Sequence, residues 1–312
     1  MSRFTNARVG VLLGGVSRER EVSLKTGSAV IEALTSLGHT VVEIDPSHEN
    51  VQQLNDAKLD VVFNALHGTY GEDGRLQGLL DWIQIPYTGE GLRASMLGFD
   101  KVLAKHQYSV AGVPVAQDLV VSAADAEAFD ISELPFELPV VVKPVAEGSS
   151  VGVTIVQTPE LFAQAMTDAA VSDVLVEQFV EGPELSVVIL GDRVLGSVEI
   201  EPVRDFYDYE AKYGEAGTRY HVPPRLSAED IACVEEVGLA AHRALGCRGV
   251  TRTDVILGPD GPIALETNTL PGMTNASLVP KVAASVGIDF PSLIGQILEL
   301  AACAEEGGYG RQ

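Results

Sequence analysis

The chain has 312 residues, of which 46% are hydrophobic, and it carries a formal net charge of −23 at pH 7. This length is enough for two or three domains with hydrophobic cores of their own. The strongly negative charge argues against nucleic acid or an anionic membrane as a partner, because both require basic protein surface.

The cysteines and the N-terminus indicate an intracellular protein. Cys233, Cys247 and Cys303 have no metal-ligand spacing, and an odd, scattered set is typical of reduced thiols in the core of a cytoplasmic chain. The apolar run at residues 9–13 is too short for a signal peptide. No segment approaches the roughly 18 apolar residues of a membrane span. We therefore expect a cytoplasmic location and no membrane contact.

The first hundred residues alternate apolar strands with helices. Strands are predicted over residues 9–13, 40–44 and 60–66, and helices over residues 19–37 and 75–83. This order is typical of an α/β unit with a parallel sheet, in which ligands gather at the carboxyl ends of the strands. The Gly14-Gly15 turn lacks the rest of the GxGxxG fingerprint, which disfavours a dinucleotide-dependent oxidoreductase.

Two loops of this unit carry polar residues. Glu19 and Glu21 lie in the first turn of a helix, where the helix dipole favours carboxylates without any functional role. The second loop, at residues 67–74, has His67 and three glycines directly after a buried strand. Glycine allows the backbone to approach a ligand closely, so this loop is a candidate binding element.

Lys101 heads a helix, and residues 112–114 after it indicate the start of a second domain. A buried strand at residues 139–144 carries Lys143 at its end. The small-residue loop at residues 147–152 offers backbone N–H groups and hydroxyls to phosphate oxygens. The GxxxxGK[ST] sequence is absent, so the chain is not a P-loop enzyme.

The following elements are a strand at residues 174–180, a hairpin at 184–201, a helix at 228–245 and a last helix at 291–304. An aromatic-rich stretch at residues 204–221 separates the first hairpin from the helix. We interpret it as a lid, because loops of this length are usually functional and five aromatic residues fit poorly with a disordered insertion.

The most informative stretch is residues 252–274. Two apolar runs around Gly-Pro-Asp-Gly predict a β-hairpin, with a turn of roughly three residues at 259–261. In that register Asp254 faces Glu266 and Arg252 faces Asn268, with all four on one face. Opposed carboxylates repel unless solvent separates them or a cation binds between them. Oxygen ligands of this kind suit Mg²⁺, so the hairpin is a candidate magnesium site.

Five groups of residues match one known family in its order: residues 14–17 with 19–24, 67–68 with 71–74, 143–144 with 147–152, 207–213, and 266–268 with 271–274. Through them the chain resembles the D-alanine–D-alanine ligases, members of the ATP-grasp superfamily, over nearly its whole length. The resemblance implies an α/β (α+β) ATP-grasp fold with an N-terminal Rossmann-like parallel-sheet domain. It also implies three domains, at residues 1–98, 99–181 and 182–312, the last containing the lid and the metal site.

The resemblance further implies the ATP-dependent ligation of two D-alanine molecules through an acyl phosphate, for peptidoglycan precursor synthesis. Glu19, Ser150 and Tyr213 would hold the first D-alanine near His67. Arg252 and the Gly272 amide would bind the oxyanion, and Ser277 and Leu278 would receive the carboxylate of the second D-alanine. The ATP ligands would be Lys101, Lys143, Ser149, Glu177, Val180, Glu184 and Lys212, and two Mg²⁺ or Mn²⁺ ions would be held by Asp254, Glu266 and Asn268. A homodimer is the family's usual state.

Some residues depart from the family pattern. Glu90 stands where a small residue is expected, Gln178 stands where lysine is frequent, and residues 96–99 are atypical. The alternatives are an ATP-grasp ligase with another D-amino or hydroxy acid acceptor and a regulatory module without turnover. Tyr213 favours an amine acceptor, because related ligases that accept D-lactate depart from tyrosine there. The lysines and metal ligands are all present, which disfavours the regulatory module.

Overall fold

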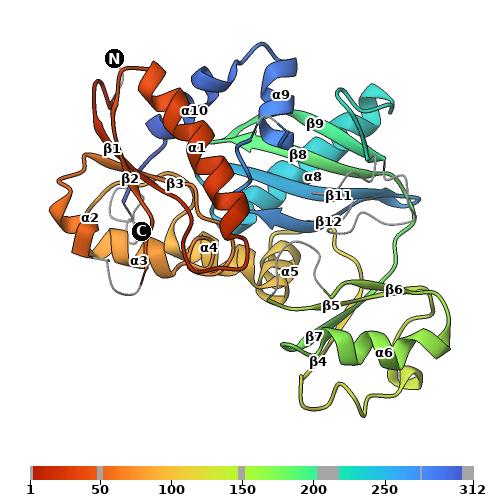
Figure 1. Cartoon of the computed structure of the whole chain (residues 1–312). Helices are drawn as coiled ribbons and strands as arrows, with labels where there is room; N and C mark the ends of the chain where they lie inside the picture. Colours follow the sequence, from red (N-terminus) through yellow and green to blue (C-terminus); the bar gives the residue numbers. More distant parts are fainter. Residues whose placement is uncertain (1–2, 48–51, 147–151, 202–217, 275, 304–312) are drawn as a thin grey trace.

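The computed structural model describes residues 3–47, 52–146, 152–201, 218–274 and 276–303. Three separate sheets organise the chain (Figure 1). The N-terminal sheet and its helices form one end of the molecule, a four-stranded sheet forms the other, and a five-stranded sheet lies next to both.

The N-terminal unit is the predicted parallel α/β layer. Its elements are β1 (Arg8–Leu12), α1 (Arg20–Ser36), β2 (Thr40–Ile44), α2 (Gln52–Asp56), β3 (Val61–Asn64), α3 (Arg75–Trp82) and α4 (Leu92–Phe99). The strands pair in parallel in the order β2-β1-β3. Val9 and Val11 of β1 are fully buried, because helices cover both faces of a parallel sheet and leave little room for polar side chains. Leu37, the residue directly after α1, is exposed.

The second unit is an antiparallel sheet covered by one long helix. Its elements are α5 (Lys101–Val110), β4 (Asp118–Val121), the 3₁₀ turn η1 (Ile131–Glu133), β5 (Val140–Pro144), β6 (Thr154–Val156), α6 (Pro159–Ala169) and β7 (Val174–Gln178). The strand order is β4-β7-β5-β6. Phe162 and Met166 of α6 pack on the valines of the sheet and close a core of its own. The strand predicted to reach residue 180 ends at Gln178.

The third unit contains the largest sheet. Its elements are β8 (Glu184–Leu190), β9 (Arg193–Glu201), β10 (Arg219–His221), α8 (Ala228–Leu245), β11 (Val250–Gly258), β12 (Gly261–Asn268), α9 (Leu278–Ser285) and α10 (Phe290–Glu299). The strands are antiparallel in the order β10-β9-β8-β11-β12. Helix α8 spans β8, β9, β11 and β12 and ends at Gly246 with a positive φ of 76°. The last helix ends at Glu299, five residues before the predicted end.

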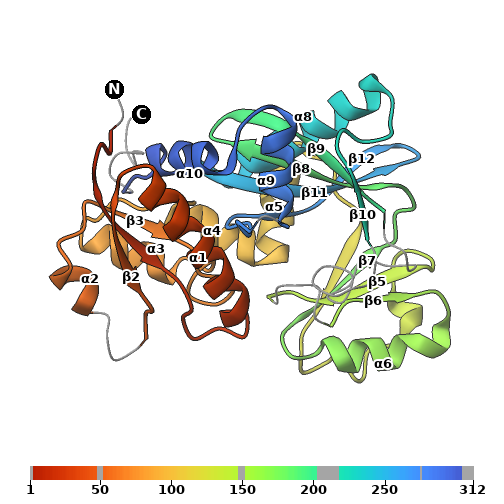
Figure 2. The same cartoon turned by 45° about the horizontal axis from the view of Figure 1, so that its top comes forward.

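The units share packing surfaces. Helix α10 lies beside α1 (Figure 2), and one hydrophobic core joins strands of the N-terminal sheet, α9, α10 and β8–β9. Helices α4 and α5 pack against α8 and β12. Helix α5 therefore belongs by contact to the third unit, although the chain continues from it into the four-stranded sheet. The three-domain division at residues 98 and 181 stays a prediction.

No single described helix is long and apolar enough to cross a membrane. Helices α9 and α10 meet the length and composition criteria only as a pair bent by 105°, and both contribute buried residues to the shared core. The cysteines are free, and Cys233 is exposed, which corrects the expectation of three core thiols.

Candidate active site

The N-terminus of α1 and the loop after β3 meet at Glu19. Glu19 is the residue that precedes α1, and a Cβ atom added to Gly68 would lie 2.5 Å from its Oε2. The Ser17 hydroxyl donates a hydrogen bond of 2.6 Å to the His67 carbonyl and locks the two loops together. Gly68 also has φ +69°, so both the backbone conformation and the approach of the carboxylate require glycine there.

His67 connects this loop to a third segment, the one that follows β12. The imidazole is 5% exposed; its Nε2 lies 3.1 Å from Thr26 Oγ1 and its Nδ1 lies 3.4 Å from Glu72 Oε1. A Cβ atom added to Gly272 would lie 4.0 Å from His67 Cε1 and 3.2 Å from Ser277 Oγ. The structure therefore brings together Glu19, His67, Gly272 and Ser277, which the sequence distributes over more than 250 residues.

Ser277 and Leu278 begin helix α9. The Ser277 hydroxyl accepts from the Thr274 amide at 3.0 Å and lies 2.9 Å from Thr274 Oγ1. In the described structure it does not cap the helix. The first amides of a helix have no intrahelical acceptor and attract anions. This helix end, next to Gly272, can therefore bind a carboxylate.

The hairpin of β11 and β12 has the predicted pairing at its polar end and a different turn. Arg252 pairs with Asn268, and Asp254 pairs with Glu266. Val255 pairs with Ala264, because an irregularity between Asp254 and Val255 shifts the register by one residue. The turn consequently has two residues, Pro259 and Asp260, between the paired Gly258 and Gly261. The prediction of a three-residue turn is therefore wrong. The one-residue shift compensates for the shorter turn, so the polar pairs are unaffected.

The polar face of this hairpin is organised around Asp254. Arg252 donates to both carboxylate oxygens, from Nε to Oδ1 and from Nη2 to Oδ2, each at 2.9 Å. The Ser186 hydroxyl of β8 donates to Oδ1 at 2.5 Å. Asn268 Oδ1 accepts from the Leu270 amide at 2.9 Å, which starts the loop towards Gly272. Among the described residues, no group of three or more His, Cys, Asp or Glu side chains forms a metal cluster.

A buried charge network lies where the second unit meets α5. Glu177 of β7 forms ion pairs with Lys143 of β5 and with Lys105 of α5, the latter at 2.5 Å. Lys105 is 4% exposed, and it also contacts the Ala116 carbonyl at 2.9 Å and Asp118 at 3.0 Å. Burial opposes the ionisation of Glu177, but the charges of Lys143 and Lys105 outweigh it and hold the pKa of that carboxyl below its usual range.

The sequence did not indicate Lys105. It lies four residues after Lys101 on the same helix, a spacing that is common in exposed helices. Its partner Glu177 is 72 residues away, and only the packing of the second unit brings the two together.

The other predicted nucleotide-binding residues lie along the path from the four-stranded to the five-stranded sheet. The Lys101 amide donates to the Val145 carbonyl at 3.2 Å, which places the start of α5 beside the end of β5. Val180 lies next to the hairpin turn, since a Cβ atom at Gly258 would be 2.7 Å from its Cγ1. Glu184 begins β8 and pairs with Ile256 of β11. Ser149, Ser150, Lys212 and Tyr213 lie outside the described residues.

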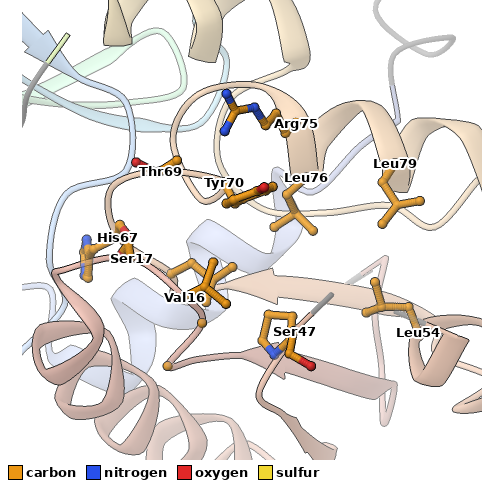
Figure 3. Close-up of a pocket in the computed structure, with 14 residues that line it drawn as sticks. Val16, Ser17, Ser47, Leu54, His67, Thr69, Tyr70, Arg75, Leu76 and Leu79 are labelled. Carbon is orange, nitrogen blue, oxygen red and sulfur yellow. Dashed lines mark hydrogen bonds between the residues drawn. The ribbon is translucent and has the colours of Figure 1, made fainter. Parts of the chain in front are cut away.

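A pocket of about 190 Å³ opens at the carboxyl ends of the three parallel strands. Figure 3 shows Ser17 and His67 at one end and Leu54 and Leu79 at the other, with Tyr70 between Arg75 and the pocket. Its lining is mostly apolar: Val16, Leu54, Leu66, Leu76 and Leu79. The loops next to Glu19 and His67 thus form one wall of this pocket, which is less polar than the site around those two residues.

Comparison with known proteins covers almost the whole chain. Residues 44–90 match the family described as D-ala D-ala ligase N-terminus, and residues 108–299 match D-ala D-ala ligase C-terminus. A D-alanine–D-alanine ligase of Anaeromyxobacter sp. (strain Fw109-5) is 48% identical over 97% of this chain and 99% of its own. One from Geotalea uraniireducens is 48% identical over 95% and 96%.

Solved structures agree with these relatives. The D-alanine–D-alanine ligase of Bacillus anthracis complexed with ATP has a TM-score of 0.81 and 35% identity, covering 94% of this chain and 95% of that one. The VanG D-Ala:D-Ser ligase of Enterococcus faecalis has a TM-score of 0.82 and 29% identity, covering 95% and 99%. The predicted ATP-grasp fold is confirmed, and the chain belongs to the D-alanine–D-alanine ligase family.

Proposed function

We propose that this protein joins two molecules of D-alanine into D-alanyl-D-alanine, with cleavage of ATP to ADP and phosphate, and that the dipeptide serves peptidoglycan synthesis. The observation that carries the proposal is the convergence of Glu19, His67, Gly272 and Ser277 in a chain whose full length is similar to D-alanine–D-alanine ligases. The ATP complex of the Bacillus anthracis ligase supports ATP as the second substrate.

The reaction proceeds in two steps. The carboxylate of the first D-alanine attacks the γ-phosphorus of ATP, ADP leaves, and an acyl phosphate forms. The amine of the second D-alanine attacks the acyl carbon, gives up a proton, and displaces phosphate as the peptide bond forms. Both steps depend on positioning and on neutralising charge, which explains a site rich in backbone amides, lysines and arginine.

Glu19 and His67 hold the first D-alanine. The Glu19 carboxylate takes its ammonium group, and His67, fixed between Thr26 and Glu72, lies beside it. Ser150 and Tyr213 complete this subsite through a hydrogen-bonded bridge, as the resemblance implies. Glu19 fixes the amine of the chiral centre, and together with contacts to the carboxylate and the methyl group this position selects the D-enantiomer.

The second D-alanine lies at the start of α9. The Ser277 hydroxyl and the Leu278 amide receive its carboxylate, supported by the helix end described above. The Gly272 amide and the Arg252 guanidinium bind the oxyanion of the tetrahedral intermediate. Loss of one such donor typically slows the reaction about 10²- to 10³-fold.

ATP lies between the four-stranded and the five-stranded sheet. Lys101, Lys143, Ser149 and Lys212 bind its phosphates. The backbone from Glu177 to Val180 contacts adenine, and Glu184 receives the ribose hydroxyls. Lys143 and Glu177 are both buried. This supports the assignment, because charged groups interact more strongly with their partners where little water surrounds them.

Two Mg²⁺ or Mn²⁺ ions would be held by Asp254, Glu266 and Asn268. The residues fit such ions: their oxygens are hard donors, and the paired positions put the two carboxylates opposite each other. When bound, the ions neutralise charge on the β- and γ-phosphates. Arg252 orients the Asp254 carboxylate through its two hydrogen bonds.

We further propose a homodimer and a cytoplasmic location. The first is supported by the resemblance to the family, and the second by the dependence on ATP and by the scattered free cysteines. Equilibrium sedimentation tests the dimer.

The experiment that tests the function measures phosphate release from ATP with D-alanine alone and with D-alanine mixed with L-alanine, D-serine or D-lactate, and identifies each product by mass. We expect release and dipeptide with D-alanine, and loss of both when EDTA removes the metal. The similarity to a D-Ala:D-Ser ligase makes D-serine the informative competitor. A mixed D-alanyl-D-serine or D-alanyl-D-lactate product at equal kcat/KM would overturn the assignment of the acceptor.

A further inference from the structure

Glu90 is a carboxylate in an unusual place. It is 1% exposed and lies in the N-terminal unit, directly before Gly91 and helix α4. Its Oε2 accepts the Arg248 amide at 2.5 Å, and its Oε1 accepts the Gly249 amide at 3.0 Å. Both donors belong to the segment that leads into β11 in the third unit. One buried side chain thus connects two units through two backbone hydrogen bonds.

Each end of this link is attached to a strand or sheet that leads to candidate site residues. On the N-terminal side, the Thr88 amide donates to the Val62 carbonyl and the Thr88 hydroxyl accepts from the Asn64 amide, both at 3.0 Å. These bonds attach the segment before Glu90 to β3, which leads into the loop of His67. On the other side, the Gly249 carbonyl accepts the Gly191 amide at 2.8 Å, so residue 249 is fixed to the five-stranded sheet.

The close approach is built into the sequence. A Cβ atom at Gly249 would lie 3.0 Å from Glu90 Oε1 and 3.1 Å from backbone atoms of Gly89, so a larger residue would push the carboxylate away. Arg248 completes the junction: its Nη2 donates to the Ala302 carbonyl at 2.7 Å, and its guanidinium stacks 5.1 Å from the centre of the Tyr87 ring.

We propose that Glu90 is a positioning residue whose ionised carboxylate holds the start of β11 against the N-terminal unit and thereby sets where Arg252 and Asp254 lie relative to Glu19 and His67. Arg252 and Asp254 follow Gly249 by three and five residues on the same strand. The proposal rests on the proposed function, because it concerns the geometry of that same site.

The link depends on pH for a physical reason. A carboxylate accepts hydrogen bonds at both oxygens, whereas a protonated carboxyl has a donor at one of them and would face an amide N–H with a hydrogen. Burial raises the pKa of Glu90 to about 7, against the two amide hydrogen bonds and the charge of Arg248. Glu90 therefore changes between its protonated and its ionised form within the neutral pH range.

Within the described part of the chain, few other titratable or charged groups face Glu90. Arg248 is the nearest charge. Cys247 precedes Arg248. Burial and the charge of Glu90 raise the pKa of the Cys247 thiol well above the usual range, so the thiol stays protonated. Arg93 of α4 is exposed, and α4 contributes the Ser95 hydroxyl, which donates to the Glu90 carbonyl at 3.4 Å.

Stability and activity are expected to respond to pH in opposite directions. A carboxyl whose pKa is raised in the folded state stabilises the fold below its unfolded pKa, and that contribution is lost as the pH rises through about 7. Activity instead rises with pH, because only the ionised form accepts both amides. A residue that merely strengthened the interface would move both quantities in the same direction.

The test compares the unaltered protein with Glu90→Gln, which keeps the size but accepts at one oxygen only, and with Glu32→Gln, an exposed glutamate of α1, as the control. The ratio of kcat for the unaltered protein to that of Glu90→Gln is measured from about pH 6 to about pH 8.5. We expect it to rise from near 1 to about 10, with the KM for ATP changed little. A ratio that does not change with pH overturns the proposal, whatever its size.

Amide hydrogen exchange without substrates separates this proposal from the proposed function. In Glu90→Gln the protection of the Arg248 and Gly249 amides is expected to fall about 10-fold or more, as for a lost hydrogen bond to a charged group. If the variant does not fold, the protection of these amides in the unaltered protein, compared at about pH 6 and about pH 8.5, replaces it. Equal protection in either comparison overturns the proposal even if the enzyme makes no dipeptide.

Discussion

Lys105 lies 2.5 Å from Glu177 and 3.0 Å from Asp118, and Glu177 pairs in turn with Lys143. Replacing a member of a buried charge network leaves its partners without compensation, which costs more than the pair itself contributes. Lys105→Met is therefore expected to lower the free energy of unfolding by on the order of 3 kcal/mol. It is also expected to raise the KM for ATP while the KM for D-alanine changes little, because Glu177 and Lys143 lose their orientation.

Urea unfolding and steady-state kinetics check this prediction. Lys25→Met, at an exposed position of α1, is the matched control and should leave both quantities unchanged. If Lys105→Met behaves like the control, Lys105 does not orient the network. A selective rise in the KM for D-alanine would instead assign Lys105 to a different subsite.

At the residue scale, the sequence located candidate side chains that lie beside a glycine-rich loop and missed those whose contacts come from packing. Glu19, His67, Gly272 and Ser277 lie next to turns whose glycines have a positive φ or a close neighbour, and such turns are visible in a sequence. Lys105 and Glu90 carry no local signal, because their partners are 72 and more than 150 residues away. In the sequence, Glu90 stands out only as a departure from the family pattern.

The N-terminal end of helix α9 allows a test of the proposed second subsite. Ser277→Ala is expected to raise the KM for the second D-alanine about 10-fold, the effect of losing one hydrogen bond to a charged group, with the KM for ATP unchanged. Because the Ser277 hydroxyl does not cap the helix within the described structure, the free energy of unfolding should change little.

Ser227→Ala is the matched control, since the Ser227 hydroxyl does cap α8 by accepting from the Asp230 amide at 3.1 Å. That variant is expected to lose about 1 kcal/mol of stability and to keep both KM values. The prediction for Ser277 is contradicted if the two variants show the same pattern, because Ser277 would then act only through the stability of its helix.

At the element scale, periodicity located most helices and strands, and turn geometry was less predictable. The helix at residues 228–245 and the hairpin at residues 184–201 have the predicted bounds, because their apolar residues recur with a clear period. The β11–β12 turn has one residue fewer than predicted, since an irregularity near Val255 compensates within the strands. Glycine and proline mark a turn in the sequence but do not fix its length.

Local sequence patterns did not predict how the three sheets pack together. Strand β11 pairs with β8, which is 60 residues earlier in the chain, and the core of the N-terminal sheet includes α9 and α10. Such contacts depend on which apolar faces meet, and one face can in principle cover several others. The family resemblance, rather than periodicity, supplied the ATP-grasp arrangement in advance.

The arrangement of sheets makes one prediction for the whole molecule. Lys143 lies on β5 of the four-stranded sheet and Glu184 lies on β8 of the five-stranded sheet, so a nucleotide bound by both must couple two bodies with separate cores. A non-hydrolysable ATP analogue is expected to slow amide hydrogen exchange in both β5–β7 and β8–β11, because ligand binding stabilises only the joined state. At about 100 times the dissociation constant, the added stability is about 2.7 kcal/mol.

D-alanine alone provides the internal control for that experiment. In the proposed function its first subsite contains Glu19 and His67, and the Ser17–His67 hydrogen bond joins the two loops that carry them in the N-terminal unit. D-alanine is therefore expected to slow exchange in the loops at residues 14–19 and 67–74 and to leave the four-stranded sheet unaffected. If ATP protected one sheet only, the nucleotide would bind within a single unit, and the placement of ATP between the sheets would be wrong. If D-alanine protected both sheets without nucleotide, closure would not require ATP, and the acyl phosphate would form in a site that either substrate can assemble.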